Sequence, residues 1–364
     1  MALDPPPRLT RPDRSAGRRR AGDTALIVTR SKPKLWLGAF VGFYRPGVED
    51  VRRLDPVSKF LYSARSVILV ISAQAAIIAG LLAAAARQFD AVAFLLVLVG
   101  FVTAHMISNL SNDYFGYRRG HDTESSPRRR YTVHPLASGV LEPRVLVTGL
   151  AILAAIGLAI TAYFVSERGW LTVAFAATGI AVMLLYDAAP VPLKSVGLGE
   201  PAVFLVWGPL MVGGGYAMIT GHVSSAALYA SIPYGLGVMS ILTGKHIDQM
   251  DFDSAHGNRT LPVLLGERTA RALNVVTVVL IYALTAVLIA LGRLTPFAAA
   301  IVLALPRGVR AVSIMSQPRP AAPPAGYVGW PLWYHRVCLE HNRLFGWSYI
   351  LGLAAGAAAS IMCF

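Results

Sequence analysis

Two polar segments interrupt an otherwise apolar chain, and they hold the side chains best suited to chemistry. The first runs from Ser108 to Glu124. Within it, Asn109, Asn112 and Asp113 stand at positions i, i+3 and i+4, which places them on one face of a helix. Carboxylates at the end of a membrane helix are costly unless they have partners. We therefore predict that this face binds a metal or a polar substrate group.

The second polar segment repeats this pattern further along the chain. Asp248 and Asp251 share one helix face, and Gln249 and Asp253 share another. Two such clusters on separate helices that open to the same side form an oxygen-rich pair. Oxygen ligands without His or Cys spacing favour Mg²⁺ over zinc, and Mg²⁺ tends to share its coordination shell with substrate phosphates. The side chains predicted to hold Mg²⁺ on this basis are Asn112, Asp113, Asp248, Asp251 and Asp253.

Basic side chains flank both segments. Those expected in the same layer are Arg118, Arg119, Arg128, Arg129, Arg130, Lys194 and Arg259. Acids for a metal together with bases for phosphate predict a bound phosphate or diphosphate, with Arg118, Arg119, Lys194, Arg259 and Asn109 as its contacts. For either acidic cluster alone, ordinary solvated residues at a helix end remain the alternative. His105 and His246 are weaker acid or base candidates, with packing as the plainer explanation.

The composition indicates the elements that must position these residues. Of the 364 residues, 55% are hydrophobic and only 14% are charged. The apolar residues fall in runs of about 18 or more, the length that a helix needs to cross a bilayer. The predicted spans are 65–86, 91–110, 145–164, 170–187, 200–219, 225–243, 271–291, 295–313 and 343–362, the eighth being shortened by Pro306. The expected fold is all-α, a polytopic membrane bundle of about nine transmembrane helices.

The basic residues also predict an orientation. Every second linker is basic, whereas the linkers between these hold little beyond Arg87, Arg168 and Arg293. The basic linkers, the N-terminus and the site are thus predicted to be cytoplasmic and the C-terminus external, in a bacterial plasma membrane. The net charge of +14 follows from this arrangement, so we do not expect nucleic acid as a partner. Residues 1–60 are expected to be a basic, largely disordered arm with a possible interfacial segment, and 61–364 the membrane domain.

Four motifs, in order, resemble the UbiA superfamily of intramembrane prenyltransferases, and within it the 1,4-dihydroxy-2-naphthoate prenyltransferase-like branch. They are Asn112-Asp113-Tyr114-Phe115 with Gly120-x-Asp122-Thr123, Pro135 to Gly139, Leu185-Tyr186 through Gly197-Leu198-Gly199-Glu200, and Asp251-x-Asp253 with Gly257-Asn258-Arg259-Thr260-Leu261. The resemblance extends over about residues 60–362.

The resemblance implies a lipid-facing cavity for a prenyl tail, with the diphosphate between the two acidic motifs and bridged by Mg²⁺. By position, Asn112 and Asp122 match the first motif, Asp253 matches the second, and Arg259 and Lys194 match basic contacts. Asp122 thereby joins the catalytic and metal set, beside Asn112, Asp113, Asp248 and Asp253. The implied activity moves a polyprenyl group from its diphosphate to a small aromatic acceptor.

The chain departs from the family pattern at two positions. Gly116 and Gln249 stand where the pattern has acids. Asp113 and Asp248 flank these vacancies, but a neighbouring helix residue points about 100° away. These departures keep two alternatives open, a terpene cyclase that needs no acceptor and a non-catalytic prenyl-lipid binder or transporter.

Overall fold

The computed structural model describes residues 47–120, 126–127, 129, 132–187, 190–327 and 329–362. The described chain is helical and contains no strand. Eight of its helices are long and apolar enough to cross a membrane, and the shorter apolar helix α9 brings the bundle to the nine spans that the apolar runs predict. The all-α membrane bundle is confirmed.

The elements follow one another along the chain with short connections. The N-terminal part comprises α3 (Val48–Arg52), α4 (Pro56–Ser63), η1 (Ser66–Ile68), α5 (Val70–Ala85), α6 (Ala91–Arg118), α8 (Pro143–Arg168) and α9 (Trp170–Asp187). The central part comprises η2 (Leu193–Val196), α10 (Gly199–Leu205), η3 (Val206–Gly213), α11 (Gly214–Thr220), α12 (Ser225–Ala255) and α13 (Leu261–Leu265). The C-terminal part comprises α14 (Glu267–Ala290), η4 (Pro296–Ala304), α15 (Leu305–Met315) and α16 (Tyr334–Met362).

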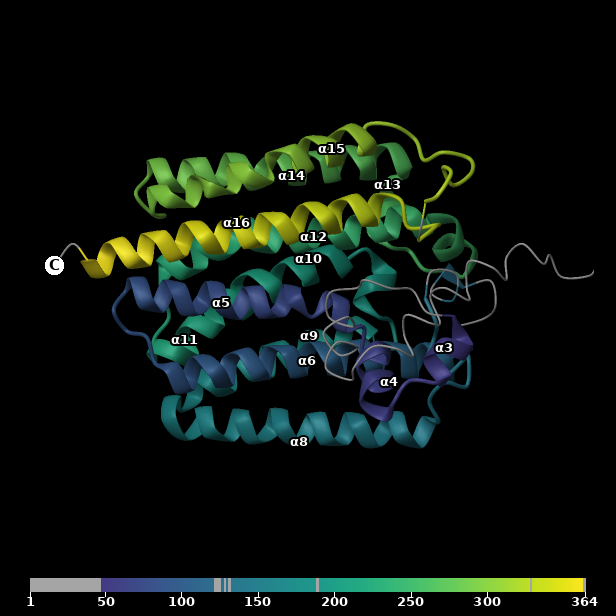
Figure 1. The fold of residues 1–364 in the computed structure, drawn as a ribbon, viewed down its shortest axis with the longest axis horizontal. Helices are drawn as coiled ribbons and strands as arrows, with labels where there is room; N and C mark the ends of the chain where they lie inside the picture. The colour runs from purple at the N-terminus through teal and green to yellow at the C-terminus, as the bar shows by residue number, and fades with distance from the viewer. Residues whose placement is uncertain are drawn as a thin grey trace, which may run out of the picture.

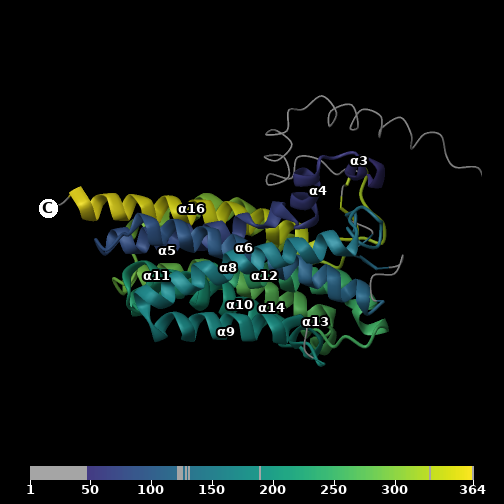
Figure 2. The ribbon, with the colours of Figure 1, turned by 90° about the horizontal axis from the view of Figure 1, so that it is seen from below.

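The long helices run along the longest axis of the molecule (Figures 1 and 2). The C-terminal end of α16 lies at one end of the bundle, and α3, α4 and α13 lie at the other (Figure 1). The core cluster joins α5, η3, α12, α14, η4, α15 and α16. In contrast, α8 and α9 bury little of their surface and expose large apolar residues such as Ile156, Leu184 and Trp170. An apolar outer surface of this kind requires lipid around it.

Several helices are longer than the apolar runs that predict them. The second and sixth runs end at 110 and 243, whereas α6 continues to Arg118 and α12 to Ala255. Hydropathy marks where a helix leaves the apolar layer, but the backbone remains helical through the polar segments. The predicted Asn, Asp and Gln side chains at 109–113 and 248–253 are thus all on helices.

The eighth span, predicted at 295–313, corresponds to Pro296–Met315, and Pro306 does not shorten it. Pro306 stands in the first turn of α15, where the missing N–H has no partner to lose, so the apolar segment continues as η4 and then α15 to Met315. Pro209 lies within η3, a π-helical segment between α10 and α11 that carries Trp207. The last part of the arm predicted at 1–60 is also helical, since α3 and α4 lie within 47–63, while residues 1–46 lie outside the described residues.

Candidate functional site

A cavity of about 2050 Å³ opens among α5, α6, α8, α9, η3 and α12 and reaches the first turns of α16. Its size exceeds the few hundred to about 1,000 Å³ of an ordinary small-molecule pocket. One end is polar, and the residues there include Arg65, Asn112, Arg119, Lys194, Lys245, Gln249, Asp253 and Arg259. The remainder is mainly apolar and is lined by residues such as Leu96, Val97, Phe101, Leu158, Phe164, Phe175, Ile180, Met183, Leu210 and Met211. The cavity therefore suits a ligand with a charged head and a long apolar tail.

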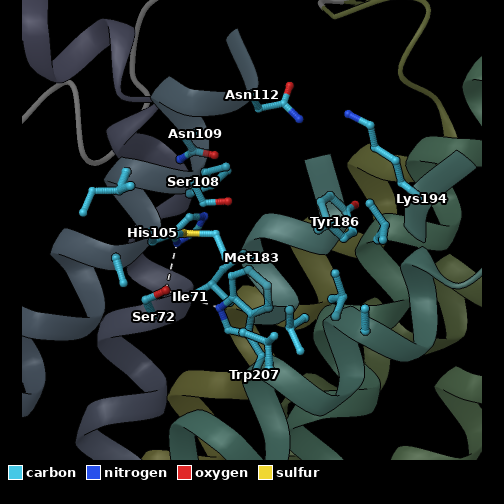
Figure 3. A pocket seen from close by; sticks show the side chains of 18 of the residues that line it. Ile71, Ser72, His105, Ser108, Asn109, Asn112, Met183, Tyr186, Lys194 and Trp207 are labelled. Carbon is cyan, nitrogen blue, oxygen red and sulfur yellow. Dashed lines mark hydrogen bonds between the residues drawn. The ribbon is translucent and has the colours of Figure 1, made fainter. Parts of the chain in front are cut away.

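The first polar segment contributes one face of the C-terminal half of α6. Asn109, Asn112, Gly116 and Arg119 line the cavity, whereas Asp113 and Arg118 do not. In the close view, Asn112 of α6 and Lys194 lie at the same end of the cavity (Figure 3). Gly116 thus occupies a cavity-facing position that lacks a carboxylate.

Asp113 points around the helix toward the N-terminal elements. It is 1% exposed and accepts a hydrogen bond from Arg65, and His134 Nε2 lies 3.9 Å from its Oδ1. Arg65 adopts a left-handed backbone with φ of 57°, which is uncommon for a residue other than glycine. The Asn109 amide donates to the carbonyl oxygen of Ala64 at 3.0 Å, just before this turn. Asp113 and Asn109 therefore position Arg65, which lines the cavity. Arg65 was not predicted from the sequence to be a site residue.

The second polar segment divides in the same way. Gln249 and Asp253 line the cavity, whereas Asp248 and Asp251 do not. Asp248 is buried and accepts hydrogen bonds from the backbone N–H groups of Tyr334 at 3.1 Å and His335 at 2.9 Å. These are the first residues of α16, so the carboxylate serves as an N-terminal cap for that helix. Asp251 is exposed on the outer surface.

Two loops bring Lys194 and Arg259 to the same edge of the cavity. The end of α12 is closed by a Schellman turn, in which Asn258 N–H donates to the Asp253 carbonyl oxygen at 2.8 Å and Gly257 has φ of 72°. Arg259 N–H then donates to the carbonyl oxygen of Ser195 at 3.0 Å, and Ser195 Oγ–H donates to Asn258 Oδ1 at 2.9 Å. The Gly257-Asn258-Arg259 motif therefore joins the loop that carries Arg259 to the loop that carries Lys194.

A buried histidine and glutamate stand beside these groups. His246 Nδ1 lies 2.8 Å from Glu200 Oε1, Glu200 is fully buried, and His246 lines the cavity. A carboxylate can only accept, so the Nδ1 of His246 carries the proton. The Glu200 of the Gly-Leu-Gly-Glu motif thus fixes the orientation of a cavity histidine.

The donor set at the polar end fits a magnesium ion shared with phosphate. Asp253 Oδ2 is buried and has no hydrogen-bond partner within the described residues, which is the state expected of a ligand oxygen. Asn112 and Gln249 add amide oxygens at the same end. Mg²⁺ is commonly held by one or two carboxylates together with substrate phosphates, so Asp253 meets this requirement without a third acid. No group of three His, Cys, Asp or Glu side chains suited to a metal occurs in the described part of the chain, and Asp122 lies outside it.

Comparison with known sequences gives the same picture over most of the chain. The UbiA prenyltransferase family matches residues 73–335. A 1,4-dihydroxy-2-naphthoate octaprenyltransferase from Bacillus subtilis is 24% identical over 62% of this chain and 71% of its own length. A UbiA prenyltransferase domain-containing protein 1 from Dictyostelium discoideum is 29% identical over 50% of this chain, and the chain spans only 55% of that relative.

Solved structures share the fold. A UbiA homolog from Aeropyrum pernix K1 has a TM-score of 0.56 at 18% identity, covering 80% of this chain and 98% of its own. A structure of digeranylgeranylglyceryl phosphate synthase has a TM-score of 0.51 at 16% identity, covering 82% and 99%. At these identities the likeness concerns the arrangement of helices.

The contacts of Asp248 lead to a first prediction. Because two backbone N–H groups of α16 lose their buried acceptor, Asp248→Ala should destabilise the protein by roughly 1–3 kcal/mol. We expect a lower thermal unfolding midpoint in detergent, measured by intrinsic fluorescence, with no change in the Mg²⁺ concentration that supports half-maximal turnover.

Asp251→Ala is the matched control, because Asp251 is exposed on the same helix and its loss should change stability by less than about 0.5 kcal/mol. Normal stability of Asp248→Ala combined with a manyfold higher Mg²⁺ requirement would instead establish Asp248 as a metal ligand, as the sequence pattern predicts.

Proposed function

Because the chain belongs to the UbiA prenyltransferase family, we propose that it moves a polyprenyl group from its diphosphate to a small aromatic acceptor inside the membrane. The observation that carries this proposal is the form of the cavity, with cations and Asp253 at one end and an apolar body large enough for a long chain. A prenyl diphosphate has the same division into a charged head and an apolar tail.

The head would bind at the polar end. The cations available there are the guanidinium groups of Arg119 and Arg259 and the ammonium group of Lys194. Charge-assisted hydrogen bonds from such groups to phosphate oxygens are stronger than hydrogen bonds between neutral groups. Asn112 and Asp253 would hold Mg²⁺, with Asp122 as a further ligand implied by the family motif. When bound, Mg²⁺ would neutralise charge that develops on the departing diphosphate.

The reaction breaks the bond between the allylic carbon and the diphosphate oxygen, and both electrons leave with the diphosphate. The allylic cation then forms a carbon–carbon bond to the acceptor ring, which loses a proton. The Lys and Arg side chains stabilise the negative charge that develops on the leaving diphosphate. The rings of Tyr186 and Trp207 line the cavity below this end and offer aromatic faces to the cation (Figure 3).

The aromatic nature of the acceptor is supported by the relatives. The name of the Bacillus subtilis relative specifies 1,4-dihydroxy-2-naphthoate as the acceptor of an octaprenyl group. At 24% identity we carry over only the class, a ring with oxygen substituents, as the proposed acceptor for this chain.

Diphosphate release by the purified protein in detergent tests this function. We expect release only when a prenyl diphosphate, Mg²⁺ and a naphthoate or benzoate acceptor are all present, with chain lengths and acceptors varied as a panel. Asp253→Asn should lower the rate by at least about 100-fold, because it removes the charge of the proposed carboxylate ligand of Mg²⁺.

The outcomes separate the alternatives. Release with Mg²⁺ but without acceptor, together with a cyclic product, would identify a terpene cyclase. Absence of release across the panel, in protein that still binds the diphosphate, would identify a non-catalytic binder.

Substitutions at Gln249 provide a second test of where Mg²⁺ binds. It lines the cavity where the family pattern has an acid, four residues before Asp253 and therefore one turn away on the same helix. Gln249→Asp should lower the Mg²⁺ concentration needed for half-maximal turnover by about 10-fold, since a second carboxylate joins the site. Gln249→Leu is the size-matched control and should not lower it. An unchanged Mg²⁺ requirement in Gln249→Asp would place the metal elsewhere.

We also propose that the polar end of the cavity faces the cytoplasm, because the basic linkers lie beside it. At the opposite end, Arg87 and Arg168 donate to the carbonyl oxygens of Ser360 and Met218. In a variant whose native Cys338 and Cys363 are replaced by serine, a cysteine in place of the exposed Arg118 should react with an impermeant maleimide in inside-out vesicles and stay unlabelled in intact cells. Labelling in intact cells would reverse the orientation.

A further inference from the structure

A hydrogen-bonded group of three side chains lies in the wall of the cavity, below the polar end. His105 of α6, Ser72 of α5 and Trp207 of η3 all line the cavity. His105 Nδ1 and Ser72 Oγ are 2.8 Å apart, and Trp207 Nε1–H donates to the same oxygen at 3.3 Å. The rings of His105 and Trp207 meet edge to face, with centroids 5.2 Å apart. Three separate helical elements thus converge on one serine hydroxyl (Figure 3).

These hydrogen bonds suit one tautomer of His105. The indole N–H of Trp207 can only donate, so Ser72 Oγ accepts from it. The Ser72 hydroxyl keeps one proton, which it can donate to His105 Nδ1, 2.8 Å away. When Ser72 donates in this way, the neutral imidazole carries its own proton on Nε2.

The Nε2–H of His105 faces the cavity. Within the described part of the chain, Nε2 makes no hydrogen bond. It is also not one of the fully buried side-chain nitrogen atoms that lack a partner, so it is accessible from the cavity. His105 is 8% exposed, and Ile71 and Met183 line the same cavity. A donor in such a poorly hydrated place is worth more to an incoming acceptor oxygen than one in water.

The position of the donor relative to the diphosphate site is set by α6. Asn112, Ser108 and His105 lie at helical spacing on one face, with Asn112 at the polar end (Figure 3). His105 lies seven positions before Asn112 on this helix, or roughly 10 Å along the axis. A diphosphate bound at Asn112, as proposed above, would leave room between the two residues for its allylic carbon and for an acceptor ring directed toward His105.

We propose that His105, held by Ser72 and Trp207, forms the acceptor subsite, and that its Nε2–H donates to an oxygen substituent of an aromatic acceptor. This inference rests on the proposed function and names the group that the acceptor must carry, a carbonyl, carboxylate or phenolate oxygen. Trp207 provides the adjoining ring surface. In the tautomer with its proton on Nε2, His105 acts here as a hydrogen-bond donor that positions the acceptor.

Acceptor binding by calorimetry, without prenyl diphosphate, tests the subsite independently of turnover. The probes are 1,4-dihydroxy-2-naphthoate, 4-hydroxybenzoate and naphthalene. The wild-type protein should bind the oxygenated rings and discriminate against naphthalene. His105→Leu should raise the Kd for the oxygenated rings roughly 10- to 100-fold, while His105→Gln, which retains an N–H donor, should recover most of the affinity.

The kinetic test compares the effect of the substitution on the KM for each of the two substrates. In His105→Leu the KM for the acceptor should rise by the same factor, while the KM for the prenyl diphosphate stays within about twofold. His222→Leu is the control, since His222 is exposed and is not among the residues that line the cavity. Thermal unfolding of each variant identifies any loss that reflects folding.

Two results would overturn the proposal, namely an unchanged acceptor Kd in folded His105→Leu, or a change confined to the prenyl diphosphate. Failure of the proposed function looks different, because the wild-type protein would then show no acceptor-dependent release of diphosphate, whether or not it binds the aromatic probes.

Discussion

The paired hydrogen bonds between the loop at Ser195 and the loop at Asn258 and Arg259 hold the polar end of the cavity together. Lys194 lies on one loop and Arg259 on the other, so these contacts at 2.9 and 3.0 Å set the spacing of two cations that would otherwise repel. The Schellman turn at Gly257 directs the second loop back from α12, on which Asp253 and Gln249 stand. The placement of Lys194 and Arg259 relative to Asp253 depends on this junction.

The sequence predicted the bundle well because membrane helices have a strong local signal. A run of about 18 apolar residues specifies both the helix and its approximate position. The prediction was incomplete where hydropathy carries no information about the backbone. At the polar ends of α6 and α12 the helix continues although the residues are no longer apolar. Pro306 was misinterpreted for a similar reason, since its effect depends on whether it stands in the first turn of a helix or inside one.

The candidate site was predictable to the level of the helix but not of the face. Asn112 and Asp113 are adjacent, yet only Asn112 lines the cavity, and the same holds for Gln249 and Asp248. Which neighbour turns inward depends on rotation of the helix about its axis, which is set by packing among distant segments. Arg65 was missed because its cavity position depends on a left-handed turn and on Asp113, 48 residues away. The partners of Asp248 are backbone groups of α16, which no side-chain pattern reveals.

The apolar lining of the cavity has a thermodynamic consequence for selectivity. A long prenyl tail is already dissolved in the bilayer, and lipid chains are as apolar as the Leu, Phe and Met side chains that line the cavity. Moving the tail from lipid into the cavity is then a transfer between two apolar environments. The free energy gained is small compared with the approximately 0.8 kcal/mol per methylene that transfer from water supplies. Added isoprene units therefore contribute little to affinity at a given mole fraction in the membrane. Discrimination among tail lengths must instead come from steric fit, and the free energy of recognition must reside in the head.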